Sequence, residues 1–250
     1  MNFKEKFLKE VQETKVLFRC MPTLPFAFLV SCLIAMNFLA NRGGAIGPFN
    51  FDCGVIVSWV AFLAADMLVK RFGAKASIKI QIAALVLELV SIGLMTLGTF
   101  LPAMYGETLE ESQVFTNIFR AAPWPLFAGS AAYVIAISFD AFVSKFVLTK
   151  FKKRSSFKAY IVASYTSTVI GQFLDNFLFS AFFSFWQPWW EGSIGSMVIA
   201  ASIGMVIELI GQAIFSPIGY KISEHWRKNK IGEEYVQLVD EAKEVNTDIA

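Results

Sequence analysis

Six apolar stretches, each long enough to cross a bilayer as a helix, occupy most of this chain. A helix rises about 1.5 Å per residue, so about 20 apolar residues span the hydrocarbon core of a membrane. The chain has 250 residues, of which 56% are hydrophobic, and the stretches leave no room for a separate soluble domain. We therefore expect an all-α, polytopic membrane protein built as a six-transmembrane-helix bundle. The predicted spans are residues 22–41, 53–70, 77–103, 124–147, 158–186 and 195–220.

Lys and Arg gather in alternate connections between these spans. They are frequent before the first span, between the second and third, between the fourth and fifth, and after the sixth, whereas the other connections are poor in them. Cytoplasmic loops carry such an excess, so both termini are predicted to be cytoplasmic. The predicted organisation is an N-terminal amphipathic segment (1–20), a six-helix transmembrane domain (21–222) and a cytoplasmic C-terminal tail (223–250). The first segment has two open interpretations, a helix on the membrane surface or a solvated helix.

Five acidic residues lie near the middles of five different predicted spans, and no Lys or Arg lies at comparable depth. A carboxylate is costly in hydrocarbon, so intramembrane acids normally face a bundle interior or a water-filled cavity. Acids without basic partners suggest a polar pathway for protons, a cation or a hydrogen-bonding solute, which favours a transporter with a small-molecule substrate. The five acids are Asp66, Glu88, Asp140, Asp175 and Glu208.

Polar residues share helix faces with these acids. Residues four apart lie on one face of a helix, so Gln172 and Asn176 flank Asp175 in one broad polar stripe of the fifth span. The same spacing places Ala132, Ala136, Asp140 and Ser144 on one face, and Ala200, Gly204, Glu208 and Gln212 on another. A simpler interpretation is that such polar residues only bond neighbouring helices, at roughly 0.6 kcal/mol each, and we favour it for Ser164, Thr168 and Gln212.

Two further positions have alternative roles. Asp66 lies toward the cytoplasmic side and is predicted to act in coupling or to pair with Lys70, one turn away. Asn37, at the outer end of the first span, is a candidate for solute entry or for capping the Gly-rich turn at residues 43–48.

Motifs for other chemistries are missing from the sequence. It has no Walker A, HExxH, GxSxG or dinucleotide-binding pattern, so we expect no enzyme and no cofactor. The single His225 and three cysteines without CxxC spacing predict no metal site. The basic residues lie at the ends of the predicted spans, where they indicate how the protein is oriented in the membrane. No nucleic-acid partner is therefore expected.

Three stretches carry a family resemblance: ADMLVKRFGAKA at 65–76, Phe139-Asp140 with the apolar and basic run up to 154, and STVIGQFLD at 167–175. With them the chain resembles the queuosine-precursor transporter family, also called vitamin-uptake-transporter-like, over about residues 37–186. Lys70 stands where the family usually has Glu, and Phe72 replaces a Tyr.

The resemblance implies import of queuine or a 7-deazaguanine precursor across a bacterial inner membrane. Asp175, Gln172 and Asn176 would then bind the edge of the base. Asp140, Glu88 and Glu208 would neutralise an aminomethyl cation or carry a coupled proton, and Asp66 and Lys70 would serve coupling or gating.

Two other functions stay open. The first is a substrate-binding subunit of an energy-coupling-factor vitamin importer, which would dock ATPase subunits through the small-residue face of Ala27, Ser31 and Ala35; the same face would also suit a homodimer. The second is a non-transport membrane interaction protein.

Overall fold

The described part of the chain is formed by helices and one β-hairpin. The computed structural model describes residues 3–40, 42–46, 49–102, 108, 110, 113–114, 116–117, 119, 123–151, 156–184 and 193–247. The helices are α1 (Phe3–Cys20), α2 (Thr23–Ala40), α3 (Val55–Phe72), α4 (Ala74–Gly98), α6 (Pro123–Thr149), α7 (Phe157–Ser184), α8 (Ile194–Lys228) and α9 (Glu233–Thr247). The hairpin pairs β1 (Gly43–Ile46) with β2 (Phe49–Asp52) in antiparallel register. The all-α prediction is confirmed apart from this hairpin.

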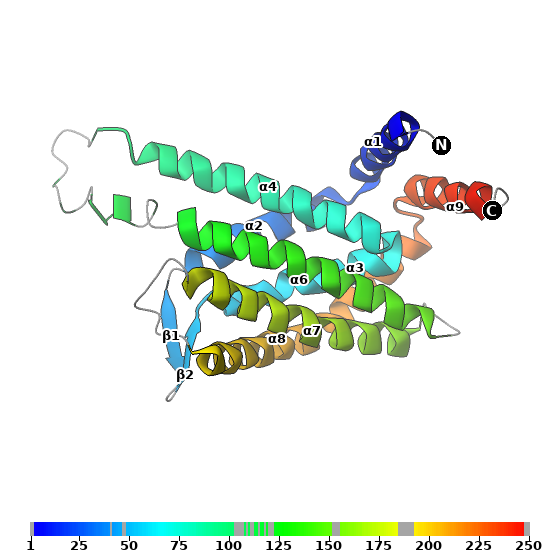
Figure 1. Ribbon diagram of the computed structural model, residues 1–250. Helices are drawn as coiled ribbons and strands as arrows, with labels where there is room; N and C mark the ends of the chain where they lie inside the picture. The colour runs from blue at the N-terminus through cyan, green and yellow to red at the C-terminus, as the bar shows by residue number, and fades with distance from the viewer. Residues whose placement is uncertain are drawn as a thin grey trace.

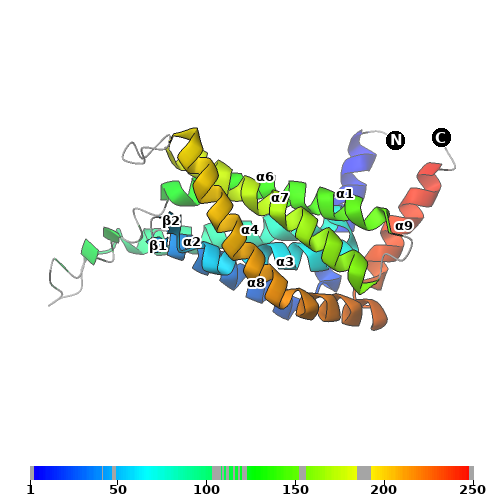
Figure 2. The same cartoon turned by 90° about the horizontal axis from the view of Figure 1, so that it is seen from below.

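Six long helices run side by side along the molecule, as Figures 1 and 2 show for α2, α3, α4, α6, α7 and α8. Both chain ends lie at one end of this bundle, where α1 and α9 are found, and the β-hairpin lies at the other (Figure 1). These are called the terminal end and the hairpin end. Termini on the same side are what an even number of crossings requires.

Four of the described helices are long and apolar enough to cross a membrane. They are Thr23–Ala40, Ala74–Gly98, Leu126–Thr149 and Ile194–Lys228, with mean hydropathy between 1.8 and 2.1. α3 and α7 have 18 and 28 residues but are more polar, because α3 carries Asp66, Lys70 and Arg71 and α7 carries the predicted polar stripe. α3 is covered by protein, since it packs against α2, α4, α6, α7 and α8.

The bundle is polar inside and apolar outside. On α6 the predicted common face is confirmed: Ala132, Ala136, Asp140 and Ser144 are all buried. The outward faces expose large apolar side chains instead, among them Val86, Val90 and Leu94 on α4, Phe139, Phe142 and Phe146 on α6, and Val206, Ile210 and Ile214 on α8. Exposed apolar surface on this scale is suited to lipid rather than to water.

Helix ends differ from the prediction at two places. α8 continues past residue 220 to Lys228, because Ser223 and Trp226 are buried and hold its last turns against the bundle. α8 also bends toward its C-terminal part (Figure 2), and Pro217 inside the helix removes one backbone hydrogen bond there. At the predicted Gly-rich turn the chain instead forms the β-hairpin; residues 47–48 lie outside the described part.

Two amphipathic helices cover the terminal end. α1 packs against α9 and α4, and Leu17 is fully buried there. Glu10 pairs with both Lys75 and Lys79 of α4. The predicted N-terminal helix is therefore confirmed as a helix, and it lies on the protein itself.

Candidate functional site

A buried polar group surrounds Asp66 at the centre of the bundle, toward the terminal end. The Asp66 carboxylate, only 1% exposed, accepts hydrogen bonds from Ser164 Oγ at 2.5 Å, Ser167 Oγ at 3.2 Å and Gln212 Nε2 at 2.8 Å. The donors come from α7 and α8 and the acceptor from α3, so the Asp66 group ties three helices together. The prediction that Ser164 and Gln212 bond neighbouring helices is confirmed. For Thr168 it is wrong among the described residues, because its buried hydroxyl has no hydrogen-bond partner there.

Asp140 of α6 lies beside this group and is fully buried. A Cβ atom at Gly171 of α7 would lie 3.0 Å from Asp140 Cβ and 2.8 Å from Phe62, so glycine is needed for this close approach. Neither carboxyl oxygen of Asp140 has a hydrogen-bond partner within the described ranges. Asp66 and Asp140 lie within electrostatic range of each other, and neither forms an ion pair with any described residue.

A second polar group lies toward the hairpin end, between α2, α4, α6 and α7. Asn37 donates a hydrogen bond to Glu88, and the Tyr133 hydroxyl donates one to Gln81 Oε1 at 2.5 Å. Tyr133 lies within electrostatic range of three acids: Glu88, Asp140 and Asp175. Three of the predicted acids, from three separate spans, thus lie near one aromatic residue.

Glu208 of α8 forms the third polar group. It accepts hydrogen bonds from Ser58 of α3 and from Asn176 Nδ2 of α7, the latter at 2.7 Å. Asn176 fits against α8 only because residue 204 is glycine: a Cβ there would lie 2.7 Å from Asn176 Oδ1. The predicted faces of α7 and α8 therefore meet each other.

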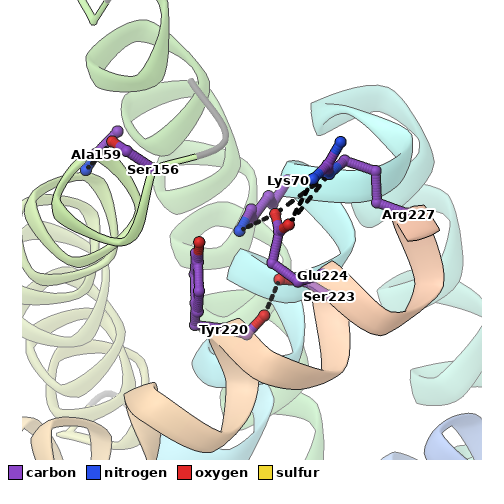
Figure 3. Close-up of polar contacts among 7 residues, drawn as sticks. All are labelled: Lys70, Ser156, Ala159, Tyr220, Ser223, Glu224 and Arg227. Atoms are coloured by element: carbon purple, nitrogen blue, oxygen red, sulfur yellow. Dashed lines mark hydrogen bonds and ion pairs between the residues drawn. The ribbon is translucent and has the colours of Figure 1, made fainter. Parts of the chain in front are cut away.

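Lys70 is placed differently from the prediction that paired it with Asp66. Its Nζ lies 2.8 Å from Glu224 Oε1 of α8 and 3.6 Å from the centre of the Tyr220 ring (Figure 3). The pairing with Asp66 is wrong, because hydroxyl and amide donors already surround Asp66 while the α8 carboxylate faces the lysine. The Lys70 side chain is 5% exposed, so this ion pair is largely shielded from water.

The remaining predicted residues lie in or beside these groups. Gln172 is fully buried, and neither its amide nitrogen nor its amide oxygen has a hydrogen-bond partner in the described part. Asp175 is half-buried on the α7 row that contains Gly171. All nine predicted site residues belong to the six long helices, and each of them is buried or half-buried.

Sequence reasoning missed several members of these groups. Tyr133 precedes Asp140 by two helical turns, and Ser58 precedes Asp66 by about two. Each therefore lies on the same helix face as a predicted acid, and this spacing could have identified both residues. Glu224 gave no such signal, because it follows the predicted end of the sixth span. The bend and extension of α8 bring it back to Lys70.

The fold and these buried acidic groups define a multi-pass helical membrane protein with a polar interior. A family model described as "Putative vitamin uptake transporter" matches residues 52–222, which include α3, α4, α6 and α7 and most of α8. The chain belongs to this family, also known as the queuosine precursor transporter family, and hence to a family of transporters rather than of enzymes. No curated protein and no solved structure shows a significant match.

Proposed function

We propose that the chain imports a small planar solute, queuine or a 7-deazaguanine precursor, across a bacterial inner membrane. In this proposal all six long helices cross the membrane, and the terminal end is cytoplasmic. Support comes from the family, from Lys and Arg at the terminal end, and from the burial of α3, with its charged residues, among the other long helices.

The observation that carries the proposal is that the carboxyl group of Asp140 is buried without a hydrogen-bond partner among the described residues. A buried carboxyl group without a hydrogen-bond donor or a cation is strongly unfavourable. Asp140 has neither among the described residues, and a second acid, Asp66, lies close by. A proton, a cation or an N–H donor of a solute is therefore required at this position during function. Asp140 is the residue that we assign to the coupled proton or to the cation of an aminomethyl precursor.

The edge of the base is assigned to Asp175, Gln172 and Asn176. A deazaguanine presents neighbouring N–H donors and a carbonyl acceptor, which a carboxylate and an amide can complement. Gln172 supports this assignment because both of its amide atoms are buried without partners. Tyr133 lies near Asp175 and supplies an aromatic ring on which a flat base can stack.

The remaining acids are Glu88, Glu208 and Asp66, and each has a separate role in its own polar group. Glu88 and Asn37 lie together toward the hairpin end, where the solute would enter. Glu208 accepts a hydrogen bond from Asn176 and can release it when a base arrives. Asp66 and Lys70 keep their predicted roles in coupling or gating.

Uptake of labelled queuine and its precursors by liposomes containing only this protein tests the proposal. We expect saturable uptake, and an at least roughly tenfold loss in Asp175→Asn and in Asp140→Asn, because each loses a charged contact to the solute or its proton. Glu234→Gln, an exposed acid on α9, is the matched control. Normal uptake by both site variants in correctly inserted protein would rule out the assigned site, and running the assay with and without a proton gradient identifies the coupling.

A second candidate, the substrate-binding subunit of an energy-coupling-factor importer, is favoured by one observation. Ala27 and Ser31 face outward from the bundle, so the small-residue face of α2 is available to a partner helix. Co-purification of ATPase subunits, with no uptake by the chain alone, would select this function. A non-transport protein would show no thermal stabilisation by purines or deazapurines.

A further inference from the structure

A pocket of about 400 Å³ opens at the terminal end, below the Asp66 group. The ends of α3, α6 and α8 line it together with α9, and its size is within the roughly 300–1,000 Å³ typical of small-molecule sites. Its walls combine apolar side chains, such as Leu148 and Val239, with a charged rim. The rim residues are Lys70, Arg71, Lys145, Arg227 and Asp240.

Lys70 lies at the boundary between this pocket and the buried polar core. It lines the pocket, and it is one helical turn from Asp66 on α3. Its ammonium group lies over the Tyr220 ring and 5.2 Å from the centre of the Tyr160 ring, and Figure 3 shows Tyr220 and Glu224 presented by the same helix. Lys70, Tyr160, Tyr220 and Glu224 form a single layer of side chains, here called the tyrosine–lysine layer.

Tyr160 continues this layer toward the acids. Its hydroxyl oxygen is buried, has no hydrogen-bond partner in the described part and lies 2.8 Å from where a Cβ of Gly219 would be. The same residue is within electrostatic range of both Asp66 and Asp140. One layer of side chains therefore separates the pocket from the acids to which we assign coupling.

We infer that the pocket is the terminal-end mouth of the solute pathway and that the tyrosine–lysine layer is its gate. This inference rests on the proposed transport function and adds the residues that regulate access to the site. The layer is held by the ion pairs of Glu224 with Lys70 and Arg227, by the cation–π contacts of Lys70 with both tyrosine rings and by the contact between these rings. Only the Lys70 contacts must break for its ammonium group to leave the layer. The four-carbon stem of Lys70 lets its ammonium group swing into the polar rim of the pocket, and a solute with N–H donors can take its place on Glu224.

Thiol labelling in membranes tests the gate without requiring transport. The reporter is Ser216→Cys in a chain whose Cys20, Cys32 and Cys53 are replaced by Ser. Ser216 is fully buried on α8, one turn from Gln212 of the Asp66 group and one turn from Tyr220 of the layer. A membrane-impermeant maleimide is applied to the terminal face in inside-out vesicles. We expect slow labelling in this background.

Glu224→Gln is the decisive variant. It removes the partner of Lys70, so the labelling rate of the reporter should rise at least about tenfold. Lys221→Gln, which removes an exposed charge one turn or less from Glu224 on the same helix, should leave the rate unchanged. If Glu224→Gln does not fold, as judged by gel filtration, Tyr220→Leu removes the cation–π contact and should raise the rate in the same direction.

An unchanged labelling rate in the folded variant would overturn the gate. A rise of the same size in Lys221→Gln would also overturn it, because the effect would then come from any substitution in this turn of α8 and not from the layer. Failure to find any transported solute would overturn the proposed function separately, since the labelling rates depend only on access from the terminal face.

Discussion

The side-chain amide of Asn37 donates a hydrogen bond to the Glu88 carboxylate across the contact between α2 and α4. Both residues were predicted as site residues from unrelated spans, and neither prediction contained their pairing. Glu88 is fully buried, and its second carboxyl oxygen has no partner among the described residues. This bond therefore satisfies one of the two carboxyl oxygens of the buried acid of α4.

Replacing Asn37 should destabilise the bundle through Glu88. In Asn37→Ala the buried carboxylate loses its donor, which costs about 1–3 kcal/mol. We expect a lower Tm and reduced uptake, measured by thermal unfolding in detergent and by the liposome assay. Ser31→Ala, on the outward face of the same helix, should change neither. Glu88→Gln in the Asn37→Ala background should recover part of the Tm, and failure to do so would contradict the assigned role of the bond.

Gly204 should be needed for the contact between α7 and α8. A Cβ at this position would lie 2.7 Å from Asn176 Oδ1, so Gly204→Ala must displace the amide that bonds Glu208. Overpacking of this kind costs about 1–3 kcal/mol, and we expect a lower Tm together with weaker solute binding. Gly93→Ala is the matched control, because nothing lies within 4 Å of its added Cβ in α4. That control should be neutral or more stable by about 0.5–1 kcal/mol, and equal Tm values for both variants would contradict the prediction.

Gly232 should hold α9 against the terminal end. It has φ of +70°, and an added Cβ would overlap the ring of Phe72. Gly232→Ala therefore combines backbone strain of about 1–2 kcal/mol with a steric clash and should release α9. Hydrogen exchange of residues 233–247 should become faster while that of α6 stays unchanged. Gly43→Ala, whose added Cβ meets nothing within 4 Å, should not change the exchange of α9.

The packing of α1 should depend on pH through Glu10. Hydrogen bonds from Lys75 and then Lys79 hold the pKa of the Glu10 carboxyl below its usual value of 4.5. A carboxyl whose pKa is lower in the folded state stabilises it above the unfolded pKa, and this contribution is lost as the pH falls through the folded pKa. We expect α1 to loosen below about pH 4.5, seen as faster hydrogen exchange of residues 3–20 after correction for intrinsic rates.

The variant Glu10→Gln provides the control for this pH effect. It should show loosened α1 already at neutral pH and should respond less to acid than the unaltered chain. An equal acid response in the two proteins would mean that other carboxyl groups cause the change.

The amino-acid sequence by itself determined the helical membrane class and the buried face of α6. These follow from hydropathy and from the 3.6-residue period, which depend only on local spacing along one helix. Ala132, Ala136 and Asp140 were therefore placed on the correct face before any contact was known. The motifs around Asp66 and Asp175 likewise lie within single helices, and they carried the family resemblance.

Only the tertiary structure decided which faces meet. The pairings of Asn37 with Glu88, of Asn176 with Glu208 and of Lys70 with Glu224 depend on helix order around the bundle and on the bend of α8. Helix spacing along one chain segment carries no information about these angles, because they result from how side chains of different helices pack together. For the same reason the sequence suggested Lys70, one turn away, as the partner of Asp66. In the structure the Asp66 carboxylate accepts its hydrogen bonds from donors more than ninety residues away along the chain.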